Sequence, residues 1–223
     1  MPESMVQIQR WINSTNAGAG ARLNIFFFPY TGECTSMFRQ WQEYLPADVG
    51  TYFVHLPRRK YCISKPLHIQ LDVVIQALGR MILPYLNRPF VFFGHSVGAL
   101  VGFELARALR RQGLPQPAQL FLSSCPAPHQ RSSHEAFRTF DVATLALDCP
   151  ISVFGGIEDS HVRFEDLLAW RMYTNHSFFA HTFPGSHLFL HSTRHMLAVL
   201  LRRDLSKLLG DVSAENDYSQ SGW

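Results

Sequence analysis

The sequence is poor in charged residues and has no long apolar run. Charged side chains make up 17% of the 223 residues, below the roughly 25% typical of soluble proteins, which excludes a disordered or coiled-coil chain. Proline, glycine, histidine or a charge interrupts every apolar run before it reaches the roughly 18 residues of a membrane span. Residues 1–11 lack the charged segment followed by an apolar segment that marks a secretory signal. We therefore expect a soluble, cytoplasmic protein with no membrane partner.

Cysteine is also scarce. The four cysteines are irregularly spaced and form no C-x-x-C pair, which excludes a disulfide framework. They are expected to be buried or free thiols: Cys34, Cys62, Cys125 and Cys149. The net charge is only +3 and the basic residues form no long run, so nucleic acid is not an expected partner.

Hydrophobic residues make up 47% of the chain, enough to bury one sizeable core at this length. We expect a single domain over residues 1–212. The polar segment 213–223 is predicted to be a disordered tail.

Short apolar runs rich in aromatic residues predict six strands, each ending at glycine, proline or serine. These runs are 23–28, 52–56, 90–93, 120–123, 151–154 and 178–183. They are almost continuously apolar, which is typical of strands buried on both faces. Helical periodicity lies between them, at 37–45, 71–82, 97–111, 164–173 and 195–209. This alternation predicts an α/β fold with a mostly parallel sheet of six or more strands flanked by helices.

The motif G-x-S-x-G occupies residues 94–98, between the predicted strand 90–93 and the helix that follows it. Flanking glycines allow a tight strand-to-helix turn, which projects the serine hydroxyl above the sheet. The sequence therefore predicts Ser96 as a nucleophile.

A serine nucleophile needs a base, and the base needs a carboxylate to orient it. In hydrolases with this elbow the chain order is serine, acid, histidine. Asp159 follows the strand 151–154, and His187 follows the strand 178–183. Parallel strands bring both loops to the edge that carries Ser96. We assign His187 as the general base and Asp159 as its partner.

Alternatives to both assignments remain open at this point. Glu158 competes with its neighbour Asp159 for the acid role. The other candidate bases are His95, His161, His191 and His195. The first of these is expected to point away from the nucleophile. The spacing of His187, His191 and His195 would align metal ligands on a helix, but the preceding proline and glycine predict a loop, so we expect no metal.

The oxyanion of an acyl-transfer reaction needs two backbone N–H donors. One comes from the residue after the nucleophile, which is Val97. The other comes from the loop after the first strand, where Pro29 has no N–H and Tyr30 is the next residue. Tyr30 and Val97 are therefore the predicted oxyanion hole.

These residues resemble the type II thioesterases of polyketide and nonribosomal peptide synthesis, and their relative that releases fatty acids from fatty-acid synthase. The resemblance spans residues 23–200 and rests on F-P-Y-T-G (28–32), F-R-x-W (38–41), L-P-x-R (56–59), F-G-H-S-V-G-A-L (93–100), C-P-I-x-x-F-G-G (149–156), A-W (169–170) and F-P-G-x-H-x-F-L (183–190).

The resemblance implies an α/β-hydrolase fold and hydrolysis of acyl groups from the phosphopantetheine arm of an acyl or peptidyl carrier protein. It implies a triad of Ser96, Asp159 and His187, and no cofactor.

The sequence departs from the family pattern at three places. Glu33 and Arg58 stand where the family has glycine. The segment 124–149 holds only about two dozen residues where the family has a lid of several helices, so we expect a much reduced lid. The cluster Arg58, Arg59 and Lys60 is a candidate contact for an acidic carrier protein. Two other functions stay open, a carboxylesterase of small free esters and a catalytically weak hydrolase fold that only binds.

Overall fold

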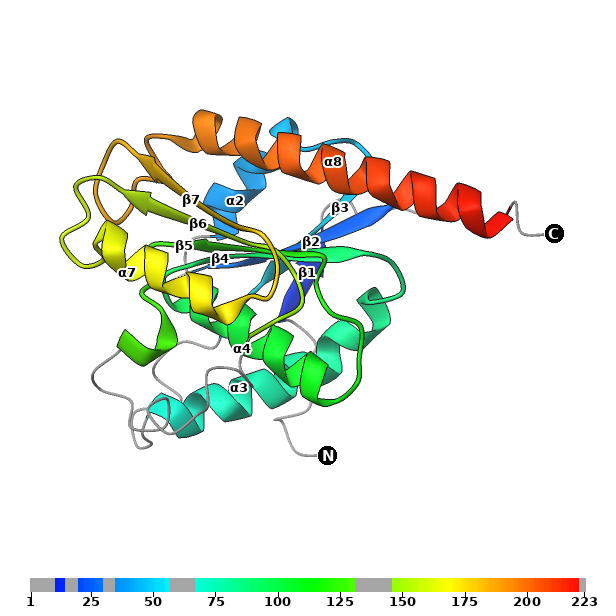
Figure 1. The fold of residues 1–223 in the computed structure, drawn as a ribbon, viewed down its shortest axis with the longest axis horizontal. Helices are drawn as coiled ribbons and strands as arrows, with labels where there is room; N and C mark the ends of the chain where they lie inside the picture. Colours follow the sequence, from blue (N-terminus) through cyan, green and yellow to red (C-terminus); the bar gives the residue numbers. More distant parts are fainter. Residues whose placement is uncertain (1–10, 15–19, 30–34, 57–66, 131–145, 221–223) are drawn as a thin grey trace.

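Seven strands form one sheet whose order is β1-β3-β2-β4-β5-β6-β7 (Figure 1). The structure is a computed structural model, and it describes residues 11–14, 20–29, 35–56, 67–130 and 146–220. The strands are β1 (Ile12–Ser14), β2 (Leu23–Phe28), β3 (Val49–Val54), β4 (Phe90–His95), β5 (Gln119–Ser123), β6 (Ile151–Gly156) and β7 (Phe178–Phe183). Only β1 runs antiparallel to its neighbour. The predicted mostly parallel α/β sheet is confirmed.

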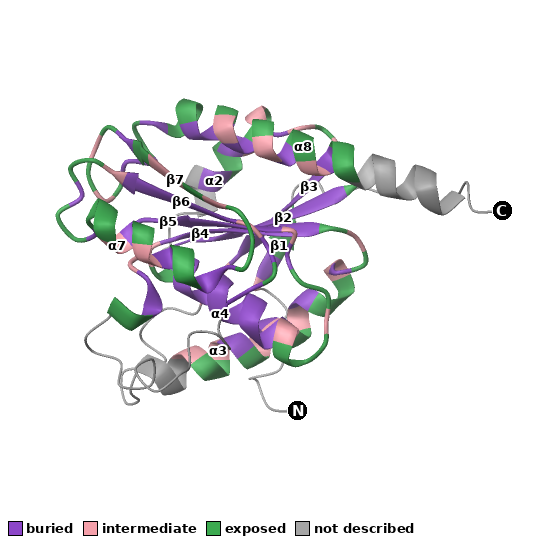
Figure 2. Ribbon diagram, in the orientation of Figure 1, coloured by how far each residue is buried: buried purple, intermediate pink, exposed green. Residues whose placement is uncertain are grey.

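Helices cover both faces of the sheet (Figure 1). The α-helices are α2 (Thr35–Trp41), α3 (Leu67–Ile82), α4 (Val97–Arg111), α7 (Phe164–Leu168) and α8 (Arg194–Gln220), and the 3-10 helices are η1 (Gln42–Tyr44), η3 (Leu83–Tyr85), η4 (Pro128–Gln130) and η5 (Ala169–Tyr173). Helices α3, α4 and α7 contribute to one hydrophobic cluster, and α2 and α8 contribute to another. The sheet lies between these two layers, which is why its central strands are buried (Figure 2).

Phenylalanine fills both layers of the core. Along β2, Phe26 and Phe28 belong to the cluster under α3 and α4, whereas Phe27 belongs to the cluster under α2 and α8. Strand β4 repeats the arrangement with Phe92 and Phe93. Successive side chains of a strand point to opposite faces, so a run of consecutive phenylalanines serves both layers at once.

The main differences from the sequence prediction are in β3 and β1, whereas β4, β5 and β6 differ from their predicted bounds by one or two residues. Strand β3 begins at Val49, because Gly50 and Thr51 pair with β2 although they interrupt the apolar run. Strand β1 was not predicted. It is three residues long, and its single buried apolar residue, Ile12, pairs with Val54. A segment so short has no periodicity to read.

Helix α8 continues through Gln220, so residues 213–220 are helical where the sequence predicts a disordered tail. No proline interrupts this stretch, and its alanine and glutamate are good helix formers. Cys125 and Cys149 are buried thiols, whereas Cys34 and Cys62 lie outside the described residues. Residues 131–145, most of the expected short lid, also lie outside them. Within the described part of the chain, no helix combines the length and the apolar character that crossing a membrane requires.

The stability of the α2/α8 layer provides a test of this packing. Phe27 is fully buried, and its ring stacks on Phe38 at 4.9 Å and on Phe53 at 5.7 Å between centroids. Phe27→Ala should lower the free energy of unfolding by about 3–5 kcal/mol. Phe179→Ala is the matched control, because that ring is 49% exposed, and it should cost about 1 kcal/mol or less. Denaturant titration measures both, and equal losses would contradict the layer assignment.

Candidate active site

Ser96 occupies a sharp turn between the end of β4 and the start of α4. Its backbone has φ 54° and ψ −118°, a region that L-residues rarely adopt. A side chain at Gly98 would overlap the carbonyl oxygen of Phe28, and one at Gly94 would overlap the backbone of Ala99. The two glycines therefore let α4 start close against β2 and β4. The Ser96 N–H donates to the carbonyl of Ser123 at 2.8 Å, which anchors the turn to β5.

A chain of hydrogen bonds joins Ser96, His187 and Asp159. The Oγ of Ser96 lies 3.2 Å from Nε2 of His187, and Nδ1 of His187 lies 2.9 Å from Oδ2 of Asp159. An ionised carboxylate only accepts hydrogen bonds, so the Nδ1 proton of His187 points at Asp159 and its Nε2 accepts from the serine hydroxyl. The structure brings the three predicted residues together from the ends of three strands, β4, β6 and β7.

Asp159 is held as a carboxylate. Its side chain has no exposed surface, and its Oδ1 accepts the N–H groups of His161 at 2.9 Å and Val162 at 3.1 Å. Burial by itself raises the pKa of Asp159, but the hydrogen bonds from the His161 backbone and from His187 outweigh it and bring the pKa below its ordinary value. Glu158 is exposed on the same loop, so the arrangement favours Asp159 over Glu158 as the partner of His187.

The loops that carry Asp159 and His187 are hydrogen-bonded to each other. The Ile157 N–H donates to the carbonyl of Phe183, and the Glu158 N–H donates to that of Gly185. Ser124 adds a third link, because its hydroxyl donates to the carbonyl of His187 at 3.3 Å. The sequence analysis did not single out Ser124. The sequence feature that could have identified it is the pair of serines at positions 123 and 124, at the end of the predicted strand 120–123.

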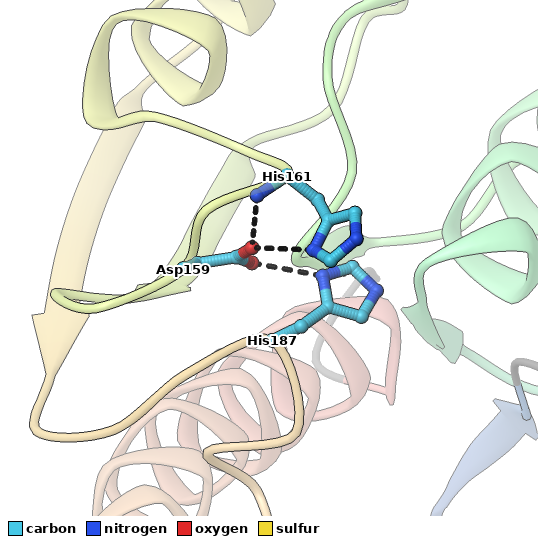
Figure 3. Close-up of side chains that lie close together, drawn as sticks. All are labelled: Asp159, His161 and His187. Atoms are coloured by element: carbon cyan, nitrogen blue, oxygen red, sulfur yellow. Dashed lines mark hydrogen bonds and ion pairs between the residues drawn. The ribbon is translucent and has the colours of Figure 1, made fainter.

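The other histidines occupy different environments. His95 is fully buried, and its Nδ1 lies 3.0 Å from Oγ of Ser123, on the side of β5. Burial, and after it the nearby His187, lower the pKa of His95 to about 3. His161 is exposed beside Asp159 (Figure 3). His195 packs edge-on against the ring of Tyr44 at 5.4 Å. His187 is therefore the histidine that reaches Ser96.

Of the two predicted oxyanion donors, the described residues include only Val97. Val97 is the first residue of α4, where the helix itself leaves N–H groups without partners and its dipole favours negative charge. Tyr30 lies outside the described residues, as do Glu33 and the basic cluster Arg58, Arg59 and Lys60.

Potential metal ligands gather at one place within the described ranges. Asp159, His161 and His187 have ligand atoms within 4.8 Å of one another (Figure 3). The row His187, His191 and His195 is not formed on one helix, because α8 begins only at Arg194.

Comparison with known proteins gives concordant matches. The profile of a family described as Thioesterase domain matches residues 24–147. Linear gramicidin dehydrogenase LgrE of Brevibacillus parabrevis is 31% identical, over 94% of this chain and 97% of that protein. Gramicidin S biosynthesis protein GrsT of Aneurinibacillus migulanus is 26% identical, over 91% of this chain and 96% of that protein.

A solved structure agrees with these sequence matches. The RedJ thioesterase from the prodiginine biosynthetic pathway of Streptomyces coelicolor superposes with a TM-score of 0.69 and 27% identity. The match covers 83% of this chain and 87% of the other.

The buried His95 gives the protein a specific pH dependence. The unfolded chain binds a proton on this ring near pH 6.5, whereas the folded chain does not until about pH 3, so stability is lost as pH falls through this window. From about pH 7.5 to about pH 5.5 this ring should remove about 1.4 kcal/mol from the free energy of unfolding. His95→Asn, which keeps a polar group for the Ser123 hydroxyl, should remove that share of the pH dependence. Denaturant titrations at both pH values measure the difference, and identical pH dependence in the two proteins would contradict it.

Proposed function

Since this chain belongs to the thioesterase domain family, we propose that it is a type II thioesterase in which Ser96, His187 and Asp159 form the catalytic triad. Its substrate is an acyl group held as a thioester on the phosphopantetheine arm of an acyl or peptidyl carrier protein. The observation that carries the proposal is the hydrogen-bonded chain from the Ser96 hydroxyl to the buried Asp159 carboxylate.

Acylation follows from this geometry. Ser96 Oγ attacks the thioester carbonyl while Nε2 of His187 takes the hydroxyl proton, and Asp159 stabilises the imidazolium that forms. The N–H groups that the sequence predicts for the oxyanion are those of Val97 and Tyr30, of which the described structure includes Val97. Collapse of the tetrahedral intermediate breaks the carbon–sulfur bond, and His187 returns the proton to the departing thiolate.

Deacylation uses the same groups in reverse. His187 takes a proton from water, the hydroxide attacks the acyl ester on Ser96, and the serine oxygen leaves with the proton that His187 returns. The products are a carboxylic acid and the free carrier thiol. A thiolate is a far better leaving group than an amide nitrogen, so the reactivity of this triad suits thioesters better than peptides.

The relatives support a carrier-bound substrate. GrsT is named for gramicidin S biosynthesis, and RedJ is a thioesterase of prodiginine biosynthesis. LgrE is named a dehydrogenase, and a dehydrogenase transfers a hydride. A relay of serine, histidine and aspartate instead transfers protons and forms an acyl ester. The site of this chain therefore favours hydrolysis. The half-buried Ser96 would also accept small free esters, so a carboxylesterase is the second candidate function.

The proposed substrate is tested with a panel of carrier proteins loaded with different acyl groups. Intact-protein mass spectrometry should show loss of the acyl mass from the carrier with the wild-type protein. Ser96→Ala should abolish that loss, because removing the nucleophile of a triad costs on the order of a millionfold. A nitrophenyl ester serves as the matched small substrate.

The outcomes separate the candidates. A higher kcat/KM for the acyl carrier than for the nitrophenyl ester supports the thioesterase function. Turnover of the ester alone supports a carboxylesterase. Acyl loss that persists in Ser96→Ala would overturn the mechanism.

The acid assignment has its own test in two neighbouring carboxylates. Asp159→Asn should lower kcat by about 10⁴, the order found for this change in another Ser–His–Asp enzyme, because the amide leaves His187 in the wrong tautomer. Glu158→Gln is the matched control, and its exposed side chain predicts a rate within a few fold of the wild type. Steady-state rates on one acyl carrier measure both. A larger loss in Glu158→Gln would reverse the assignment.

A further inference from the structure

Asp159, His161 and His187 form a cluster that hydrolysis does not fully use. His187 Nδ1 lies 2.9 Å from one carboxylate oxygen of Asp159, and His161 Nδ1 lies 3.8 Å from the other. The two imidazole rings lie on the same side of the carboxylate, with centroids 5.4 Å apart (Figure 3). His161 donates a hydrogen bond to Asp159 through its backbone N–H. The imidazole ring of His161 has no role in the proposed hydrolysis.

The distances in this cluster fit a transition-metal ion. Zinc bonds of about 2.0–2.1 Å in a tetrahedron place ligand atoms about 3.3 Å apart. The separation of His187 Nδ1 from Oδ2 of Asp159 is 2.9 Å and that of His161 Nδ1 from Oδ1 is 3.8 Å, on either side of that value, and the candidate ligand atoms of the three residues lie within 4.8 Å of one another. Two imidazole nitrogens and one carboxylate oxygen are a ligand set that zinc accepts in proteins, with the fourth position left to water.

The burial and exposure of the ligands also fit. Asp159 is fully buried and fixed by two backbone N–H groups, while the His161 side chain is 77% exposed. The fixed carboxylate supplies a preorganised oxygen, and the exposed ring can turn toward an ion that arrives from solvent. Little reorganisation is therefore needed to close the site.

We propose that Asp159, His161 and His187 form a zinc-binding site that switches the enzyme off. A zinc ion on Nδ1 of His187 takes the position of the proton that now points at Asp159. The neutral ring then carries its proton on Nε2, after exchange with solvent, and no proton is gained or lost overall. Nε2–H donates to Ser96 Oγ and can no longer accept its proton.

The inhibitory consequence rests on the proposed function, but zinc binding itself does not. The two are measured separately, so failure of one is distinguishable from failure of the other. Isothermal titration calorimetry with zinc chloride on the wild-type protein should show one site per chain. Cobalt chloride in place of zinc should give the visible absorption of a tetrahedral cobalt centre.

His161→Gln tests the site without touching the triad residues. It keeps the backbone N–H that Asp159 accepts and removes the ligand nitrogen. Zinc affinity should fall by at least about tenfold, since even residues that only support metal ligands are worth about 10–100-fold. His176→Gln is the matched control, because His176 is exposed just before β7, at the opposite end of that strand from His187, and it should bind zinc as the wild type does.

The rate of acyl-carrier hydrolysis provides the second readout, with each variant compared with its own zinc-free rate. Zinc should inhibit the wild type and His176→Gln at the same concentrations, and EDTA should restore both. His161→Gln should need at least about ten times more zinc for the same inhibition. Equal zinc affinity in His161→Gln and the wild type, or no calorimetric binding to the wild type at millimolar zinc, would overturn the proposal.

Discussion

The backbone at Ser96 is held in a conformation that costs an L-residue about 1–3 kcal/mol, and the position of the hydroxyl depends on that conformation. Two contacts keep it there. The first is the close approach of α4 to the carbonyl of Phe28, which glycine at position 98 makes possible. The second is the hydrogen bond from the Ser96 N–H to β5. Because residues 98–109 of α4 are all buried, the helix cannot shift to relax the turn without opening the core.

The positions of Asp159 and His187 depend on the same edge of the sheet. Ser124 is the other described residue besides Ser96 that combines a side chain with a positive φ, at 44°. It follows β5, which lies between β4 and β6 in the sheet. Its N–H donates to Phe154 of β6, and its hydroxyl donates to the carbonyl of His187. Strain and hydrogen bonding are thus concentrated where three loops meet, so the separations of the reacting groups are set by the register of parallel strands rather than by any one loop.

Much of this arrangement is readable from the sequence, and the limits have physical causes. The apolar runs and the elbow motif predicted the sheet and the place of Ser96, because burial on both faces and a tight turn each leave a strong local pattern. The choice between Asp159 and Glu158 was not decided by spacing, since adjacent residues on a loop differ only in the direction that folding gives them. The ring of His161 and the hydroxyl of Ser124 both meet His187, which follows a different strand, and no local pattern records such contacts. Residue 30, with its backbone N–H, lies outside the described chain, so its predicted role remains a prediction.

Strand β7, which is followed by His187, lies at the edge of the sheet and, among the described strands, pairs with β6 alone. Of its residues only Phe183 is buried, whereas β2 and β4 are buried throughout. Strands with few buried contacts open locally at a lower free-energy cost than the global transition. Detachment of β7 would carry His187 away from Ser96 while the central strands stay paired. We therefore expect inactivation by mild denaturant or heat to begin as partial unfolding of this strand, before the core is lost.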